Sequence, residues 1–276
     1  MMSLPRYVVI MKQVGETPLV ALERARKEHN LPADIPLTYA GRLDPMASGA
    51  LLILIGEECK KQRNYHALDK EYVVELLFGI SSDTADVLGI VSPEVPKTLT
   101  ESDSRRVLEN LHGPITLPYP HFSSKTVRGK PLHTWALEGR LNEITVPMQN
   151  AIIHKLVYGG LKTVTHEEVL KIVRTKIETI PPVTDSRKAL GADFRRDQVR
   201  ASWNTVATQG PSPYQILRFT CTASSGTYMR SLCERIAKEL GTTGLAYSIH
   251  RSRIGKYFGI PGIFGLWVQT YANDGG

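Results

Sequence analysis

The sequence predicts an α+β domain organised around a β-sheet. Residues 50–55 and 72–78 are apolar runs of strand length, which is typical of strands buried on both faces. Residues 227–241 form the clearest amphipathic segment, because apolar residues recur every four positions from Leu232 to Leu240. Segments of the two kinds alternate irregularly rather than as repeated strand–helix–strand units. This arrangement favours an α+β fold over a doubly wound parallel sheet.

The N-terminal part is predicted to begin with a short buried strand over residues 7–11. A helix is expected next, since Thr17 can cap its N-terminus and Pro18 suits the first helical position. The apolar face predicted for this helix consists of Leu19, Leu22 and Ala25. The apolar strand over residues 50–55 follows and ends at Gly56.

The strand over residues 72–78 is apolar on both faces except at Glu75, which indicates a central place in the sheet. Residues 100–111 are predicted to form a helix. The side chains expected to turn inward from it are Val107, Leu108 and Leu111.

Residues 215–222 alternate in polarity, which predicts a strand with one buried face. That face is expected to carry Leu217, Phe219 and Cys221. In the amphipathic helix that follows, Thr227 is the expected N-cap and Gly241 the expected end.

Residues 163–210 differ from the rest of the chain. Residues 169–180 and 193–206 are predicted to be helices, separated by a turn at Pro181 and Pro182. We interpret this stretch as a helical insertion in one catalytic domain spanning residues 1–276, and a surface decoration is preferred to an RNA-gripping element.

Charge and composition restrict the class of protein. The 276 residues include 34 Lys and Arg against 27 Asp and Glu, a net charge of +7, which favours polyanionic partners such as nucleic acid. The apolar runs are far shorter than the ~20 residues of a membrane-spanning helix. No basic segment leads into a long apolar stretch near the N-terminus, so a cytoplasmic location is expected. Three cysteines without a CxxC pair support neither a disulfide framework nor a zinc site.

Four clusters are candidates for chemistry. Residues 39–49 place Asp44 before a proline at the mouth of a buried strand; this is either a plain turn or a loop that presents a carboxylate to a cleft. Residues 70–86 combine Lys-Glu-Tyr with a polar turn. Residues 122–133 form a basic loop that is either solvated or bound to phosphate. Arg230 lies in a first helical turn, where the macrodipole disfavours a cation, so it has either an anionic partner or solvent.

Taken together, these clusters resemble the TruB-type tRNA pseudouridine-55 synthases. The similarity extends from Lys12 to Tyr257. The residues that carry it are Gly41-Arg42-Leu43-Asp44-Pro45 with Ala47 and Gly49, Lys70-x-Tyr72 with Gly79, Thr84 and Asp86, then Ser124, Lys125, Gly129 and Lys130, then Gly226-Thr227-Tyr228-Met229-Arg230, and finally Arg251 to Tyr257. The resemblance implies the pseudouridine synthase fold, with a mixed, mostly antiparallel central sheet flanked by helices and loops.

The resemblance also implies an activity, the isomerisation of a T-loop uridine in tRNA without a cofactor or a metal. Asp44 corresponds to the family's nucleophile, and Arg230 would keep it charged. Tyr72 corresponds to a tyrosine that stacks on the target base and moves the C5 proton. Attack at ribose C1′, attack at uracil C6 and proton abstraction leading to a glycal all remain open as routes.

The resemblance further implies a set of residues that contact RNA. Asp86 would touch RNA in the site, Lys12, Lys125 and Lys130 would hold phosphate, and Arg251 would help to wall the pocket. The full set of expected substrate-binding residues is Tyr39, Gly41, Arg42, Leu43, Lys12, Lys70, Asp86, Lys125, Lys130 and Arg251.

This sequence departs from the family at three places. Tyr39 stands where many bacterial members have a histidine, residues 163–210 have no recognised counterpart, and no C-terminal PUA domain is expected after Tyr257. We expect a monomer that acts on the T-arm of tRNA without a guide RNA and without a membrane. The alternatives are a pseudouridine synthase with another RNA range and a non-catalytic tRNA chaperone.

Overall fold

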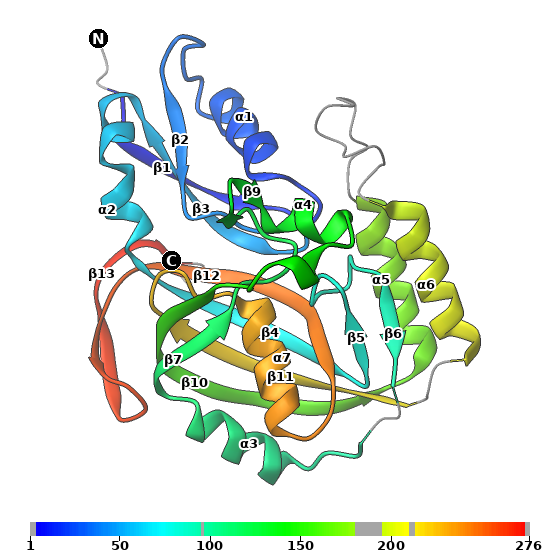
Figure 1. Ribbon diagram of the computed structural model, residues 1–276. Helices are drawn as coiled ribbons and strands as arrows, with labels where there is room; N and C mark the ends of the chain where they lie inside the picture. The colour runs from blue at the N-terminus through cyan, green and yellow to red at the C-terminus, as the bar shows by residue number, and fades with distance from the viewer. Residues whose placement is uncertain (1–3, 95–96, 180–194, 210–212, 274–276) are drawn as a thin grey trace.

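A nine-stranded sheet forms the centre of the fold (Figure 1). The computed structural model describes residues 4–94, 97–179, 195–209 and 213–273. The strands run in the order β1 (Tyr7–Lys12), β3 (Ser48–Ile55), β12 (Gly244–Ile260), β4 (Asp69–Phe78), β11 (Tyr214–Ala223), β10 (Met148–Val164) and β7 (Gly113–Pro118). In addition, β2 (Leu37–Ala40) pairs with β3, and β13 (Phe264–Asn273) pairs with β12.

Neighbouring strands in this sheet are antiparallel, apart from a short parallel contact between β12 and β3. The expected α+β fold with a mixed, mostly antiparallel central sheet is therefore confirmed. Two small hairpins lie outside the sheet, β5 (Ile80–Ser82) with β6 (Val91–Pro93) and β8 (Thr126–Val127) with β9 (Lys130–Pro131).

Helices flank the sheet (Figure 1). α7 (Met229–Glu239) packs on β12, β7 and β4 and buries Leu232 and Ile236 completely. The remaining helices are α1 (Pro18–Glu28), α2 (Gln62–His66), α3 (Glu101–Asn110), α4 (Leu132–Leu137), α5 (His166–Thr179) and α6 (Arg196–Gln209), with short 3₁₀ turns η1 (Gly56–Lys61) and η2 (Leu141–Glu143). None of the described helices is long and apolar enough to cross a bilayer.

The predicted strands β1, β3, β4 and β11 are all present. β4 lies between β12 and β11, which confirms its central place. β1 is an edge strand, so Tyr7 and Met11 keep more than a third of their surface exposed and the expectation of a fully buried strand is wrong. The helix over residues 100–111 is confirmed as α3, with the Thr100 side chain as its N-cap.

Two details of the predicted helices are wrong. In α1 the Thr17 cap is present, but Leu19 is 57% exposed and the buried face consists of Ala21, Leu22 and Ala25. At the start of α7 the Thr227 hydroxyl donates to the Ser224 carbonyl, and Tyr228 occupies the N-cap position. Glycine and serine residues just before the helix allow the turn from Ser224 to Thr227. The local sequence does not distinguish this turn from a helix that the Thr227 side chain caps.

The helices α5 and α6 lie side by side between β10 and β11 in the chain (Figure 1). Their apolar faces join the main core, and Trp203 donates from its indole nitrogen to the Val87 carbonyl at 3.0 Å. The expectation of a surface decoration is therefore wrong for these helices. The predicted Pro181–Pro182 turn lies outside the described residues.

Candidate active site

Asp44 lies in the connection between β2 and β3. These strands pair from Leu37↔Ile55 to Ala40↔Leu52, so both ends of the connection are held by the sheet. On either side of Asp44 the chain is anchored in the core by Leu43, 4% exposed, and Met46, 1% exposed. A turn bond from the Ala47 amide to the Asp44 carbonyl tightens the loop. The Asp44 side chain itself is 37% exposed, and it is therefore open to a ligand.

Arg230 in the first turn of α7 binds Asp44 directly. Its Nε donates to Asp44 Oδ2 at 2.8 Å, and its two terminal nitrogens donate to the carbonyls of Thr84 at 2.8 Å and Phe122 at 3.2 Å. The Arg230 side chain is only 4% exposed. The sequence allowed either an anionic partner or solvent for this cation, and the partner is a carboxylate.

Asp86 is a second carboxylate on the same guanidinium. Its Oδ2 lies 3.7 Å from Arg230 Nε, and its Oδ1 accepts from the Thr84 hydroxyl at 2.8 Å and from the Leu88 amide at 2.9 Å. Burial raises the pKa of Asp86, and the charge of Arg230 opposes that rise. Burial lowers the pKa of Arg230, but the two carboxylates outweigh burial and raise it. Asp86 is enclosed by protein and lies against Arg230, and its expected contact with RNA stays a prediction.

Tyr72 lies on the central strand β4, with Cys221 of β11 and Arg251 of β12 as its cross-strand neighbours. Burial raises the pKa of its phenol, and the charge of Arg251 together with a hydrogen bond from it acts in the opposite direction. Asp44 is also close enough to raise the pKa of Tyr72. The charge of Asp44, the partner of Arg230, therefore reaches the Tyr72 phenol.

Three of the expected RNA-binding cations are buried instead. Lys12 is completely buried and donates to the carbonyls of Gln13 at 2.9 Å and Ala47 at 2.6 Å. Lys70 is 5% exposed and donates to the carbonyls of His66 and Leu68. Burial lowers the pKa of Lys12 to about 8 and, with the charge of Arg251, that of Lys70 to about 7.

Arg251 is the third of these cations, and it is 1% exposed. Protein shields the side chains of Lys12, Lys70 and Arg251, and their expected contacts with RNA stay predictions. The side chain of Leu43 is likewise part of the core. Tyr39 is half-buried and packs against the cluster between α1 and β3, which leaves only part of its ring for a base.

Other expected contacts lie at the surface. Arg42 is exposed and donates to the Ser124 hydroxyl at 2.9 Å, and Lys125 is exposed over the Tyr119 ring at 4.9 Å. Lys130 is half-buried and pairs with Glu138 at 2.7 Å, so it is less available to phosphate.

Gly41 has a φ of +79°, and a Cβ there would lie 3.4 Å from a terminal nitrogen of Arg251. Glycine is therefore required at this position by the backbone.

The sequence analysis did not assign a role to Tyr228, although the residue stands in the quoted Gly-Thr-Tyr-Met-Arg motif. Its ring lies 5.4 Å from that of Tyr119, centroid to centroid. Burial, followed by the charge of Asp44, raises its pKa. Tyr228 therefore borders the Asp44 site. It stands two residues before Arg230 in the chain, and this proximity was the signal that could have identified it.

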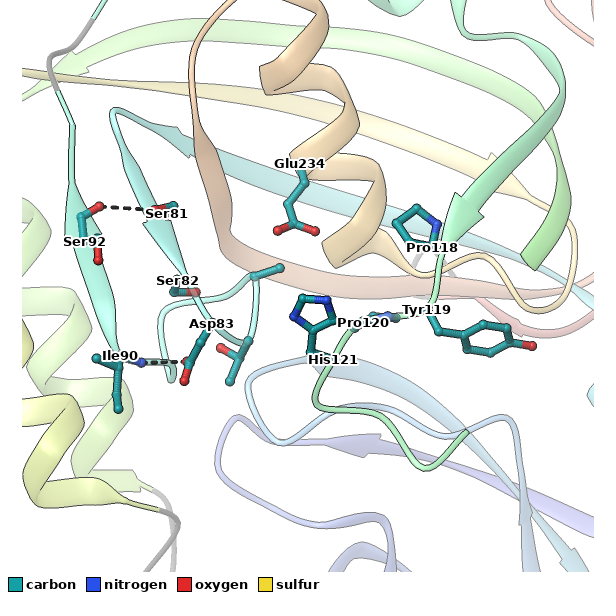
Figure 2. Close-up of a pocket in the computed structure, with 12 residues that line it drawn as sticks. Ser81, Ser82, Asp83, Ile90, Ser92, Pro118, Tyr119, Pro120, His121 and Glu234 are labelled. Carbon is teal, nitrogen blue, oxygen red and sulfur yellow. Dashed lines mark hydrogen bonds between the residues drawn. The ribbon is translucent and has the colours of Figure 1, made fainter. Parts of the chain in front are cut away.

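A cavity of about 450 Å³ opens beside this site. Residues 81–85 and 118–121 line it, together with Glu234 of α7. Figure 2 shows Glu234 and His121 pointing into the cavity from opposite walls. Thr84 lines the cavity, and its carbonyl also accepts a hydrogen bond from Arg230. The cavity therefore adjoins the site of Asp44 and Asp86. In the described part of the chain, no three His, Cys, Asp or Glu side chains gather as metal ligands would.

The fold is that of a pseudouridine synthase. A chain in the crystal structure of a Cbf5–Nop10–Gar1 complex superposes with a TM-score of 0.53 at 14% identity, over 90% of this chain and 48% of that one. A second match, in an archaeal box H/ACA Nop10–Cbf5 complex, has a TM-score of 0.50 and covers the same share of this chain.

The sequence is similar to one family of enzymes. Residues 36–164 match the N-terminal domain of the TruB family pseudouridylate synthases. The chain is 27% identical over 259 residues to tRNA pseudouridine synthase B of Caldicellulosiruptor saccharolyticus, covering 94% of this chain and 70% of the relative. It is 30% identical over 236 residues to tRNA pseudouridine synthase 4 of Saccharomyces cerevisiae, covering 75% of this chain and 57% of the relative. The chain is therefore similar to the TruB family of pseudouridylate synthases over residues 36–164.

Proposed function

We propose that this protein isomerises the T-loop uridine of tRNA, position 55, to pseudouridine in the cytoplasm, without a guide RNA and with Asp44 as the nucleophile. The observation that carries the proposal is the Asp44–Arg230 ion pair, 2.8 Å long, between a half-exposed carboxylate and a buried guanidinium. The names of the relatives, tRNA pseudouridine synthases B and 4, support tRNA as the substrate.

The ion pair suits a carboxylate that must attack while it is charged. Arg230 is held by two backbone carbonyls as well as by Asp44, so its position does not depend on the carboxylate. A guanidinium fixed in this way compensates the desolvation of Asp44 when RNA fills the site. The carboxylate can then add to the nucleoside and split one difficult rearrangement into two steps.

In the reaction the N1–C1′ bond breaks, the uracil turns, and a C5–C1′ bond forms, so no atom is gained or lost overall. Asp44 forms and later releases a covalent bond, or it removes a proton in the glycal route. Tyr72 takes the C5 proton at the end. Extruding the uridine from its stack costs a few kcal/mol. Stacking on Tyr72, worth about 1–3 kcal/mol per base, offsets part of that cost.

The test is a reaction with unmodified tRNA transcript and purified protein alone. Pseudouridine is located by carbodiimide labelling and primer extension, and we expect a single stop at the T-loop uridine. A transcript with cytidine at that position is the matched control and should give no stop. Modification at another uridine would contradict the proposed position, and an unchanged transcript that still binds would favour the chaperone alternative.

Replacing Tyr72 with phenylalanine should leave tRNA affinity within about twofold of the wild type, because the ring that stacks is retained. The late proton transfer should slow by about 10²–10⁴-fold, the usual contribution of a positioned acid or base. Single-turnover kinetics with tritium at uridine C5 measures this step. Tritium release at the wild-type rate would remove the proton-transfer role from Tyr72.

A further inference from the structure

Arg251 is a buried cation that the family resemblance assigned to the wall of the RNA pocket. Its side chain is 1% exposed, and no carboxylate pairs with it in the described part of the chain. A buried charge without a counter-ion is costly unless hydrogen bonds replace its lost hydration. The partners that Arg251 does have therefore indicate what it is for.

Its first partners are the two ends of the segment that carries Asp44. Arg251 Nε donates to the Ala50 carbonyl at 2.7 Å, and one terminal nitrogen donates to the Gly41 carbonyl at 3.2 Å. One guanidinium therefore bridges the two ends of the segment from Gly41 to Ala50. At Gly49 the segment lies directly on the β12 backbone, because a Cβ there would come within 2.3 Å of the Arg251 carbonyl oxygen.

Its second partner is Tyr72. The two residues are paired across β12 and β4, and the charge of Arg251 acts on the phenol. That interaction favours the phenolate and so opposes the effect of burial on the pKa of Tyr72. The same side chain therefore touches the backbone of the nucleophile segment and the tyrosine that faces the base.

We propose that Arg251 is a positioning residue, which holds the Asp44 segment and the Tyr72 phenol in one fixed arrangement and does not bind RNA. The inference rests on the proposed function for the roles of Asp44 and Tyr72. Arginine suits the task because its planar fork donates in several directions at once. A lysine ammonium at the same place could not hold Gly41, Ala50 and Tyr72 together.

The test compares Arg251→Gln and Arg251→Lys with Lys256→Gln, which removes a charge at an exposed position of the same strand. We expect Arg251→Gln to lower the single-turnover rate about a hundredfold, because misplacement of reacting groups by about 1 Å costs that much. Arg251→Lys keeps the charge and should still lose most of the rate. The tRNA dissociation constant should stay within about twofold for both, as for Lys256→Gln.

A second readout does not depend on activity. The Tyr72 phenol is titrated by NMR with tyrosine labelled at Cζ, and its signal is assigned by its loss in Tyr72→Phe. Asp44, Cys221 and Arg251 are the groups that face the phenol. In Arg251→Gln the pKa of Tyr72 should rise, and amide hydrogen exchange over residues 41–50 should accelerate. Lys256→Gln should change neither quantity.

The proposal fails if Arg251→Gln keeps the wild-type rate, or if a loss of tRNA affinity accounts for the whole loss of rate. It also fails if the phenol titration and the exchange of residues 41–50 are both unchanged. Should Arg251→Gln not fold, as judged by thermal unfolding, Arg251→Lys provides the same three measurements. If the wild type modifies no tRNA, the proposed function fails, whereas the titration and the exchange still test the position of Arg251.

Discussion

Asp44→Asn is expected to abolish the isomerisation of tRNA uridine, with a loss of at least about a thousandfold in the single-turnover rate, equal to about 4 kcal/mol in the barrier. The amide has the same shape as the carboxylate but is not a nucleophile and is not a base of comparable strength. The Arg230 guanidinium keeps its bonds to the Thr84 and Phe122 carbonyls, so the fold should survive the change. Carbodiimide mapping of a T-arm transcript measures the result.

The matched control is Asp34→Asn, which makes the same chemical change at an exposed position. It should leave the rate within about twofold of the wild type, as surface substitutions usually do. Binding of tRNA to Asp44→Asn should remain close to normal, since phosphate contacts dominate affinity. Pseudouridine formed by Asp44→Asn at more than a few per cent of the wild-type rate would show that Asp44 is not the nucleophile.

Arg230→Met should reduce the rate by about 10²–10³-fold, the range found when one preorganised electrostatic donor is removed. Methionine fills a similar volume but leaves Asp44 without its cation and two carbonyls without donors. Affinity for tRNA should change much less, because the guanidinium is 4% exposed and faces protein groups. Filter binding and single-turnover kinetics on the same transcript separate the two effects.

Arg230→Met should also lower the melting temperature. Asp86 then becomes a buried carboxylate without its cation, and breaking a buried pair in this way costs about 3–5 kcal/mol. The double variant Arg230→Met/Asp86→Asn removes that charge and should recover much of the stability but none of the activity. An affinity for tRNA that falls in step with turnover would assign Arg230 to RNA binding instead.

Several site residues were predictable because their signal is local. Asp44 stands in a tight turn before the apolar strand β3, and Arg230 stands in the first turn of the amphipathic helix α7. A cation at a helix start is unusual and is visible without a structure, whereas Asp44 was a candidate because its turn stands at the mouth of a buried strand. The strands β3, β4 and β11 were predictable for a similar reason, because their apolar side chains lie close together in the chain and most of them are buried.

The long strands β10 and β12 were not predicted. Half or more of the side chains on β10 are partly or fully exposed, and its sequence includes Gly159 and Gly160, which weaken a strand pattern. In β12 a register shift between Arg251 and Arg253 and charged residues along the strand interrupt the alternation of polarity. This strand pairs with β4, which is distant in the chain, and with β13, which follows it directly. Neither contact is visible in the polarity pattern of β12 itself.

The chain itself determined which residues were candidates for the chemistry, since an aspartate in a turn, a tyrosine on an apolar strand and an arginine at a helix start are local facts. Only the tertiary structure decided what each cation does. Arg230 meets Asp44 across 186 positions, and Arg251 meets the Gly41 and Ala50 carbonyls across more than 200. Polarity predicts that lysine and arginine face water, but backbone carbonyls take the place of that water, so Lys12, Lys70 and Arg251 lie inside the protein. For Lys70 these carbonyls are close in the chain, and for Arg251 they come from distant segments.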